Sequence, residues 1–347
     1  MERIIKCSEA IREAIDQEMA IDERVIVLGQ GIDDVKGMWG TTLGLQKKYG
    51  AERVFDTPLA EDGMTGVAIG AALAGLRPIH THIRMDFLVL AMNQLVNIAA
   101  KSRYMYGGSV KVPLVVRAVI GRSWGQGAQH SQALHSWFAH IPGIKVVMPA
   151  TAYDAKGCLI QAIRDDNPVL FVEHRMVHQA QSHVPPESYT VPLGRARVLT
   201  PGSQLTIVAT GHMVMESMRA HAALEKAGLS VEVIDPVTIS PLDTETIFAS
   251  VEKTGRLLVV DNGWLNCGFS AELIARAAEH FQDRSIQYGR MGFAPVTCPT
   301  TKVLENEFYP DVRRIANRAA GMIQPGKPAP IGPQEEAPEI TQFKGPF

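Results

Sequence analysis

Short apolar runs rich in β-branched residues recur along the first half of the chain, and several are separated by longer segments of helical period. The apolar runs cover residues 25–28, 78–83, 112–117, 145–148 and 168–172. The helical segments include residues 88–104 and 153–164, and residues 4–15 predict a capped amphipathic helix. This alternation predicts a mainly parallel sheet flanked by helices, an α/β fold.

The alternation restarts after a polar stretch that contains several prolines. Apolar runs at 205–209, 231–234 and 256–260 then alternate with helical segments at 215–226 and 268–280. We therefore expect two α/β domains, at residues 1–178 and 197–323, joined by a linker at 179–196. Residues 324–347 are rich in proline and cannot easily bury a core, so we expect a disordered tail.

One polar turn leads directly into a glycine-spaced apolar run. Thr57 and Pro58 precede Glu61, and a glycine follows at positions 63, 66 and 70. These glycines fall on roughly one helical face, which would let a helix press its backbone against a neighbour. Glu61 is then either a carboxylate held rigidly at the edge of the core or an ordinary first-turn acid favoured by the helix dipole.

Composition and charge narrow the classes of function. Lys and Arg total 34 against 36 Asp and Glu in 347 residues, and neither sign forms a long run. This balance does not indicate binding to nucleic acid or to an anionic membrane, and no apolar run is long enough to span a bilayer. Four widely spaced cysteines favour reduced, buried thiols in a cytoplasmic protein.

Further motifs extend the pattern around Glu61. They are Gly-Leu-Arg-Pro at 75–78, Gln-His-Ser-Gln at 129–132, Pro-Gly-Ile-Lys-Val-Val at 142–147 and Ala-Ile-Arg-Asp-Asp-Asn-Pro at 162–168. In order and spacing, from about residue 4 to about residue 320, the chain resembles the β subunits of the thiamine-diphosphate-dependent decarboxylase component of 2-oxo acid dehydrogenase complexes. The resemblance implies a transketolase-type pyrimidine-binding domain followed by a transketolase-type C-terminal domain.

The resemblance also implies roles for single residues. Thiamine diphosphate needs a carboxylate that hydrogen-bonds its pyrimidine nitrogen N1′, and Glu61 matches that carboxylate. Phe87 matches the aromatic beside the aminopyrimidine, although simple core packing would also explain it. Leu59 and Leu90 are the other expected cofactor contacts. His130 matches the active-site histidine, which steadies or protonates groups on the substrate carbonyl.

The chain departs from the family's usual pattern at positions that could contact the substrate. His82 and Arg84 stand where relatives carry an acidic and aromatic run, and Arg122 and Trp124 precede the histidine motif. Arg122 would suit a carboxylate or phosphate group of the substrate, whereas an ion pair at the surface or at a subunit interface would also explain it. These departures leave the cofactor expectation intact but open the question of which substrate is used.

The resemblance has implications for two cations, potassium and Mg²⁺. Ala162, Asp165 and Asn167 match a loop that binds structural potassium through oxygen ligands, although the same residues suit an ordinary helix end. The chain lacks a Gly-Asp-Gly motif followed by Asn, which holds Mg²⁺ and the diphosphate in this superfamily. We therefore expect an α subunit to bind Mg²⁺ and the diphosphate, in a heterotetramer of two α and two β subunits.

The expected reaction is oxidative decarboxylation of a 2-oxo acid with transfer of the acyl group to lipoamide on an acyltransferase core. A split transketolase-like or acyloin-forming transferase is the alternative enzyme, and a non-catalytic scaffold subunit is the alternative outside catalysis. Lipoamide-dependent acyl transfer would support the first, and aldehyde-dependent carbon–carbon bond formation the second.

Overall fold

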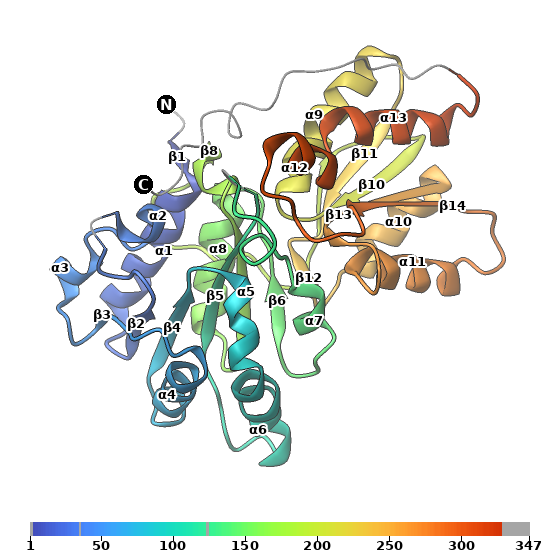
Figure 1. Cartoon of the computed structure of the whole chain (residues 1–347). Helices are drawn as coiled ribbons and strands as arrows, with labels where there is room; N and C mark the ends of the chain where they lie inside the picture. Colours follow the sequence, from blue (N-terminus) through green and yellow to red (C-terminus); the bar gives the residue numbers. More distant parts are fainter. Residues whose placement is uncertain (1–2, 35, 123–124, 328–347) are drawn as a thin grey trace. The chain divides into compact units, whose positions relative to one another are not determined.

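The computed structural model describes residues 3–34, 36–122 and 125–327, in two compact units (Figure 1). Among these residues, unit 1 holds the chain up to Ile120 together with Trp137–Leu193. Unit 2 holds Gly121–Ser136 and the residues from Gly194 onward. Trp124 and residues 328–347, most of the expected tail, lie outside the described residues.

The core of unit 1 is a sheet with the strand order β6-β7-β5-β4-β2-β3, in which every neighbouring pair is parallel. The strands are β2 (Val25–Gly29), β3 (Val54–Asp56), β4 (Arg77–His82), β5 (Val115–Ile120), β6 (Lys145–Val147) and β7 (Val169–His174). The flanking helices are α1 (Cys7–Ile21), α2 (Gly37–Gly40), α3 (Leu45–Tyr49), α4 (Glu61–Leu73), α5 (Met85–Leu88), α6 (Ala100–Met105), α8 (Ala152–Arg164) and α7 (His135–Ala139), whose first two residues belong to unit 2.

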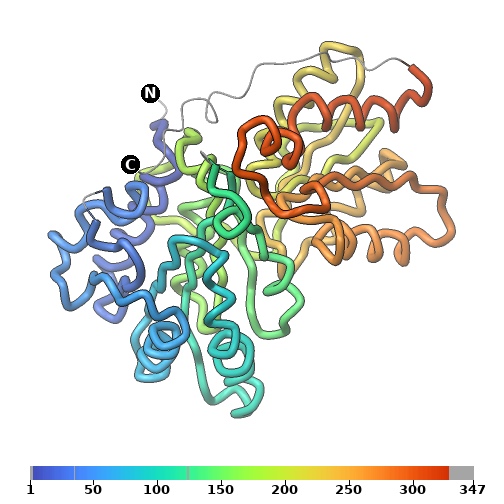
Figure 2. Tube along the Cα trace, viewed as in Figure 1, coloured from blue at the N-terminus to red at the C-terminus, as the bar shows by residue number. Residues whose placement is uncertain are grey.

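Nearly every residue of the central strands is buried, which explains why these strands appear as continuous apolar runs. Strands that are far apart in sequence, such as β2 and β4, lie side by side (Figure 2). Helices α1 and α8 pack against each other along their buried faces. The mainly parallel, helix-flanked sheet predicted from the periodicity is confirmed.

Three local predictions in unit 1 need correction. Residues 4–6 form β1 (Ile4–Lys6), which pairs antiparallel with β8 (Gln181–His183) in the expected linker, so the first helix begins only at Cys7. Strand β5 begins after Pro113, because proline has no N–H to donate to a sheet. The single helix expected at residues 88–104 is a succession of α5, the 3₁₀ turn η1 (Val89–Ala91), the π-helix η2 (Asn93–Ala99) and α6.

Unit 2 has a smaller sheet with the order β14-β13-β10-β11-β9, in which only β9 runs antiparallel to its neighbour. Its strands are β9 (Arg197–Thr200), β10 (Leu205–Ala209), β11 (Val231–Asp235), β13 (Arg256–Trp264) and β14 (Gln287–Phe293). The remaining elements are η3 (Val177–Gln179) of unit 1 and β12 (Thr238–Ser240), α9 (His212–Lys226), α10 (Thr244–Thr254), α11 (Phe269–His280), α12 (Lys302–Phe308) and α13 (Val312–Ile323) of unit 2. The second α/β unit is thus present.

Two smaller findings bear on the sequence expectations. None of the helices in the described residues is long and apolar enough to cross a membrane. All four cysteines are free thiols, and Cys7, Cys158 and Cys298 are buried as expected. Cys267 is exposed, so the expectation of buried thiols is wrong for this one residue.

Candidate active site

The candidate residues of unit 1 follow the carboxyl ends of three neighbouring strands. Gln30 comes directly after β2, Asp56 ends β3 and leads to Glu61, and His82 ends β4. Because these strands are adjacent and parallel in the order β4-β2-β3, their carboxyl ends share one edge of the sheet. Ligands of open parallel α/β sheets bind at this edge.

Glu61 is the first residue of α4, and its side chain is held from β2. The Nε2 atom of buried Gln30 donates a 2.8 Å hydrogen bond to Glu61 Oε1. A carboxylate at the first turn is also favoured by the helix dipole, so the ordinary structural role and a fixed catalytic position are compatible. Sequence reasoning missed Gln30, which lies in the Gly-Gln-Gly motif at residues 29–31.

The backbone of Gly29 explains why this motif places Gln30 where it does. Gly29 has φ +140°, and a Cβ atom there would lie 2.2 Å from the carbonyl oxygen of Thr81 on the adjacent strand. Only glycine fits such a close approach, so β2 can turn sharply at its end. Gly29 therefore allows the turn that places Gln30 beside Glu61.

The glycine face of α4 is open in this chain. A Cβ at Gly63 or Gly70 would meet nothing within 4 Å, and one at Gly66 would meet only the side chain of Gln94, at 3.5 Å. The expected packing of this face against a neighbouring backbone is thus absent among the described residues. Apolar side chains nearby are exposed as well, namely Leu59 (80%), Leu90 (58%) and Val67 (54%).

The residues at the end of β4 and directly after it are less open to solvent. His82 is buried and lies 3.5 Å from the hydroxyl of Thr65, and burial lowers the pKa of His82 well below its usual value. His82 is therefore a neutral ring at neutral pH. Arg84 is partly buried, which lowers its pKa, while the carboxylate of Asp86 opposes that shift. Phe87 is half-buried on α5.

His130 lies in unit 2, within Gly121–Ser136, which we call the histidine segment. Its side chain is half-buried. Arg122, near the start of the segment, is buried, and its Nη2 donates a 2.5 Å hydrogen bond to Asn306 Oδ1. The guanidinium group is thus already engaged by unit 2 itself.

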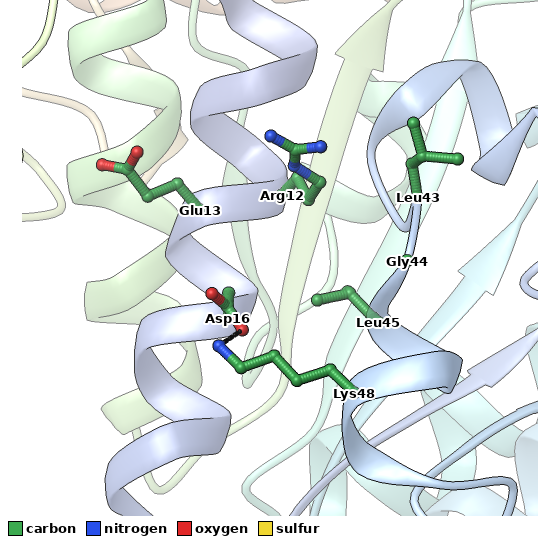
Figure 3. A pocket seen from close by; sticks show the side chains of 7 residues that line it. All are labelled: Arg12, Glu13, Asp16, Leu43, Gly44, Leu45 and Lys48. Carbon is green, nitrogen blue, oxygen red and sulfur yellow. Dashed lines mark hydrogen bonds and ion pairs between the residues drawn. The ribbon is translucent and has the colours of Figure 1, made fainter.

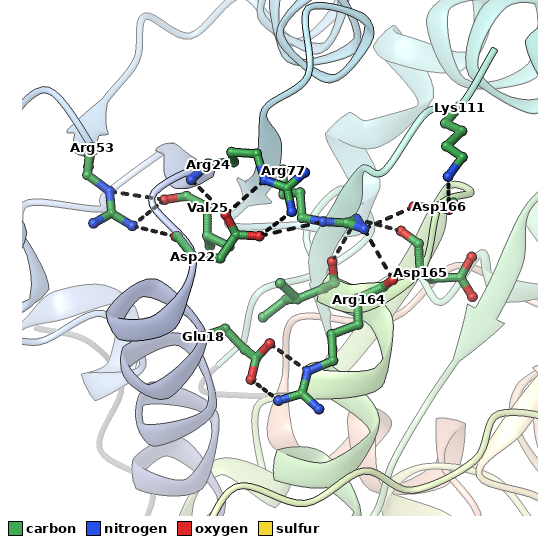
Figure 4. Close-up of polar contacts among 11 residues, drawn as sticks. Glu18, Asp22, Arg24, Val25, Arg53, Arg77, Lys111, Arg164, Asp165 and Asp166 are labelled. Carbon is green, nitrogen blue, oxygen red and sulfur yellow. Dashed lines mark hydrogen bonds and ion pairs between the residues drawn. The ribbon is translucent and has the colours of Figure 1, made fainter.

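The loop expected to bind potassium is surrounded by cationic side chains (Figure 4). Arg77 donates hydrogen bonds to the carbonyl oxygens of Ile163, Arg164 and Asp165 at the end of α8 and pairs with Asp166. Lys145 pairs with the Asp165 carboxylate. The carbonyl of Ala162 accepts the N–H of Asp165, as at an ordinary helix end. The oxygen donors suit a hard cation, but these cationic side chains already engage several of them.

A separate cavity of about 210 Å³ lies between α1 and α3 (Figure 3). Its charged lining includes Asp16 and Lys48, which form an ion pair of 2.6 Å. The predicted site residues do not line it.

Comparison with known proteins agrees with this architecture. Residues 4–179 match the family described as transketolase, pyrimidine binding domain, and residues 194–315 match transketolase, C-terminal domain. A solved structure titled split gene transketolase, inactive beta4 tetramer, superposes with a TM-score of 0.75 over 92% of this chain and 98% of that chain. Its sequence identity is 21%, so this likeness shows the fold alone.

Curated relatives are similar over nearly the whole chain. The β subunit of acetoin:2,6-dichlorophenolindophenol oxidoreductase from Cupriavidus necator is 42% identical, over 94% of this chain and 100% of the relative. The mitochondrial pyruvate dehydrogenase β subunit of Drosophila melanogaster is 42% identical, over 88% and 86%. The acetoin relative from Bacillus subtilis (strain 168) is 38% identical, over 95% and 99%. The chain therefore belongs to the family of β subunits of thiamine-diphosphate-dependent 2-oxo acid dehydrogenases, as its motifs predicted.

Proposed function

We propose that this chain is the β subunit of an enzyme that oxidatively decarboxylates a 2-oxo acid and transfers the acyl group to a lipoyl arm. Membership of the dehydrogenase β-subunit family supports the reaction class. The observation that carries the proposal is Glu61, which stands at the shared strand edge with its carboxylate oriented by Gln30.

The residues around Glu61 suit the pyrimidine half of thiamine diphosphate. A carboxylate is a strong acceptor for a ring nitrogen that carries a proton, and the Gln30 amide leaves the second carboxylate oxygen available for that bond. Phe87 offers an apolar face, and exposed Leu59 and Leu90 offer further apolar contacts. When bound, thiamine diphosphate supplies the electron sink that decarboxylation requires.

We assign proton transfer at the substrate carbonyl oxygen to His130. His130 is half-buried, and histidine is the side chain that most often acts as a general acid or base in such steps. Arg84 is our candidate for the substrate carboxylate, because it keeps a cationic group near the end of β4. Arg84→Gln should raise KM more than it lowers kcat, and an unchanged KM would exclude this role.

We propose that an α subunit binds Mg²⁺ and the diphosphate, and that two α and two β subunits form a heterotetramer. The open glycine face of α4 and its exposed apolar side chains support a protein partner, since helices pack closely where glycines remove side-chain bulk. A lipoyl acyltransferase core is the proposed acceptor of the acyl group.

Two minor proposals remain, on potassium and on location. Structural potassium would use Ala162, Asp165 and Asn167, and a thermal midpoint equal in KCl and NaCl of the same ionic strength would exclude it. The four free thiols support a reducing compartment, and we propose the cytoplasm. Recovery of the protein outside the cytoplasmic fraction of its cells would contradict this location.

The experiment that tests the proposed function compares Glu61→Gln with Asp62→Asn in the complex with the α partner. Asp62 is the exposed neighbour in the same helical turn, so it controls for charge at the α4 terminus. Glu61→Gln should lower kcat for 2-oxo acid decarboxylation about 100-fold or more, the size of a lost acid–base group, while Asp62→Asn stays near wild type. Full activity in Glu61→Gln would refute the proposal. Activity only with an aldehyde acceptor would favour the transferase alternative.

A further inference from the structure

Among the described residues of the histidine segment, those before α7 form no regular secondary structure, so their conformation depends on side-chain contacts. Residues 125–134 contain neither helix nor strand, and α7 begins only at His135. A catalytic side chain needs a position fixed to within about 0.5 Å, and loops hold such positions less well than helices or strands do. Something outside the backbone hydrogen bonding must therefore fix His130.

The first group of contacts lies before His130, at Arg122. Besides its hydrogen bond to Asn306, the Arg122 Nη2 atom lies 3.4 Å from Glu305 Oε2. The guanidinium carbon lies 4.9 Å from the centre of the Tyr309 ring, a cation–π contact. Arg122 is 7% exposed and Glu305 is 3% exposed. Removal of either side chain would therefore leave the other charge buried without this ionic partner.

The backbone of the histidine segment also lies close to Thr300, near the residues that bind Arg122. Gly125 and Gly127 have positive φ angles, of +82° and +68°. A Cβ atom at Gly125 would lie 2.8 Å from the Thr300 carbonyl oxygen, and one at Gly127 would lie 2.6 Å from Thr300 Cγ2. The segment thus runs in contact with Thr300, just before α12, the helix that carries Glu305 and Asn306.

A second group of contacts lies after His130. The buried His135 Nε2 atom is 3.1 Å from Asp261 Oδ1, which also accepts a 2.9 Å hydrogen bond from the Thr210 hydroxyl. The backbone N–H of Phe269 donates a 3.0 Å hydrogen bond to Ser136 Oγ. His130 therefore lies between two points at which buried polar contacts attach the segment to unit 2.

We infer that Arg122 is a positioning residue, which fixes the histidine segment through Glu305, Asn306 and Tyr309 and so places His130 for proton transfer. This inference rests on the proposed function for the role of His130. Arg122 bound in this way does not contact the substrate. Its loss should therefore disturb the chemical step, because a misplacement of about 1 Å can cost about 100-fold in rate.

The test uses Arg122→Met, with Arg122→Lys as the conservative variant and Arg314→Met as the matched control. Arg314 also bonds a residue of α12, through the carbonyl of Glu307 (3.0 Å), but lies outside the contacts of the histidine segment. Each variant is studied by hydrogen exchange on the chain alone and by kinetics in the complex with its α partner. Asn306→Ala, a milder change in the same contact, serves as the second variant if Arg122→Met does not fold.

In Arg122→Met, amide exchange over residues 125–134 should be at least about tenfold faster, and kcat should fall about 10- to 100-fold with KM nearly unchanged. Arg122→Lys should recover part of both losses, and Asn306→Ala should show the same changes at smaller size. Arg314→Met should match wild type in both readouts.

Unchanged exchange over residues 125–134 in a folded Arg122→Met chain would overturn the inference. A raised KM with unchanged kcat would also overturn it, since Arg122 would then bind the substrate. Hydrogen exchange of the chain needs no activity. If the wild-type complex acts on no 2-oxo acid, the proposed function fails, while the exchange comparison still decides whether Arg122 fixes the segment.

Discussion

At the scale of single residues, the carboxylate of Glu61 accepts a hydrogen bond from Gln30. The catalytic role of Glu61 stays a prediction, but its position at a helix start could be predicted from its motif, because Thr-Pro, Glu and the spaced glycines follow one another in the sequence. Gln30 could not, because it lies far away in sequence and meets Glu61 only once β2 and β3 are adjacent. Arg122 illustrates the same limit, since the sequence shows a cation but not the contacts it makes with α12.

Gln30→Leu tests whether the amide orients Glu61. A hydrogen bond to a charged group contributes about 1.5–3 kcal/mol, so its loss should lower kcat/KM or thiamine diphosphate affinity of the complex about 10- to 100-fold. Gln46→Leu is the control, because Gln46 also donates an amide hydrogen bond in unit 1, to the Val54 carbonyl at 3.0 Å. Kinetic constants and cofactor affinity equal to wild type in Gln30→Leu would show that Glu61 needs no such support.

At the scale of elements, the periodicity located most strands and helices, and it failed where a local constraint or a distant partner intervened. Strand β5 begins only after Pro113, which has no N–H to donate. Residues 4–6 pair as a strand with β8 instead of forming the first turn of the predicted helix. The break of residues 88–104 into α, 3₁₀ and π turns has no signal in the apolar pattern. For α4 the helix itself was predicted correctly, but no element in the described part of the chain covers its glycine face.

Gly70→Leu tests whether a partner covers the glycine face of α4. A Cβ atom at position 70 would meet nothing within 4 Å among the described residues, and replacing a helical glycine stabilises a helix by about 0.5–1 kcal/mol. The thermal midpoint of the isolated chain should therefore not fall, whereas affinity for the α partner should drop at least about tenfold. Gly321→Leu on α13 is the control, since a Cβ there also meets nothing. Undiminished assembly of Gly70→Leu would place the partner elsewhere.

At the scale of the whole molecule, fold class and family could both be predicted, since strand–helix alternation and motif order extend over nearly the full chain. Attachment of the histidine segment could not be predicted. Gly121–Ser136 lies between two elements of unit 1 in sequence, yet its contacts through Arg122, Thr300 and Asp261 place it in unit 2. These contacts join residues that are far apart in the sequence, and they form only in the folded chain, so no local sequence pattern indicates them.

The central claim is that this chain binds only part of the cofactor and needs an α subunit for the rest. The most direct measurement is calorimetric titration of thiamine diphosphate and Mg²⁺ into the chain alone and into its mixture with the α partner. We predict tight Mg²⁺-dependent binding in the mixture only, and a weaker response with Glu61→Gln in place of wild type. Tight Mg²⁺-dependent binding by the isolated chain, or no binding by a well-folded mixture, would contradict the claim.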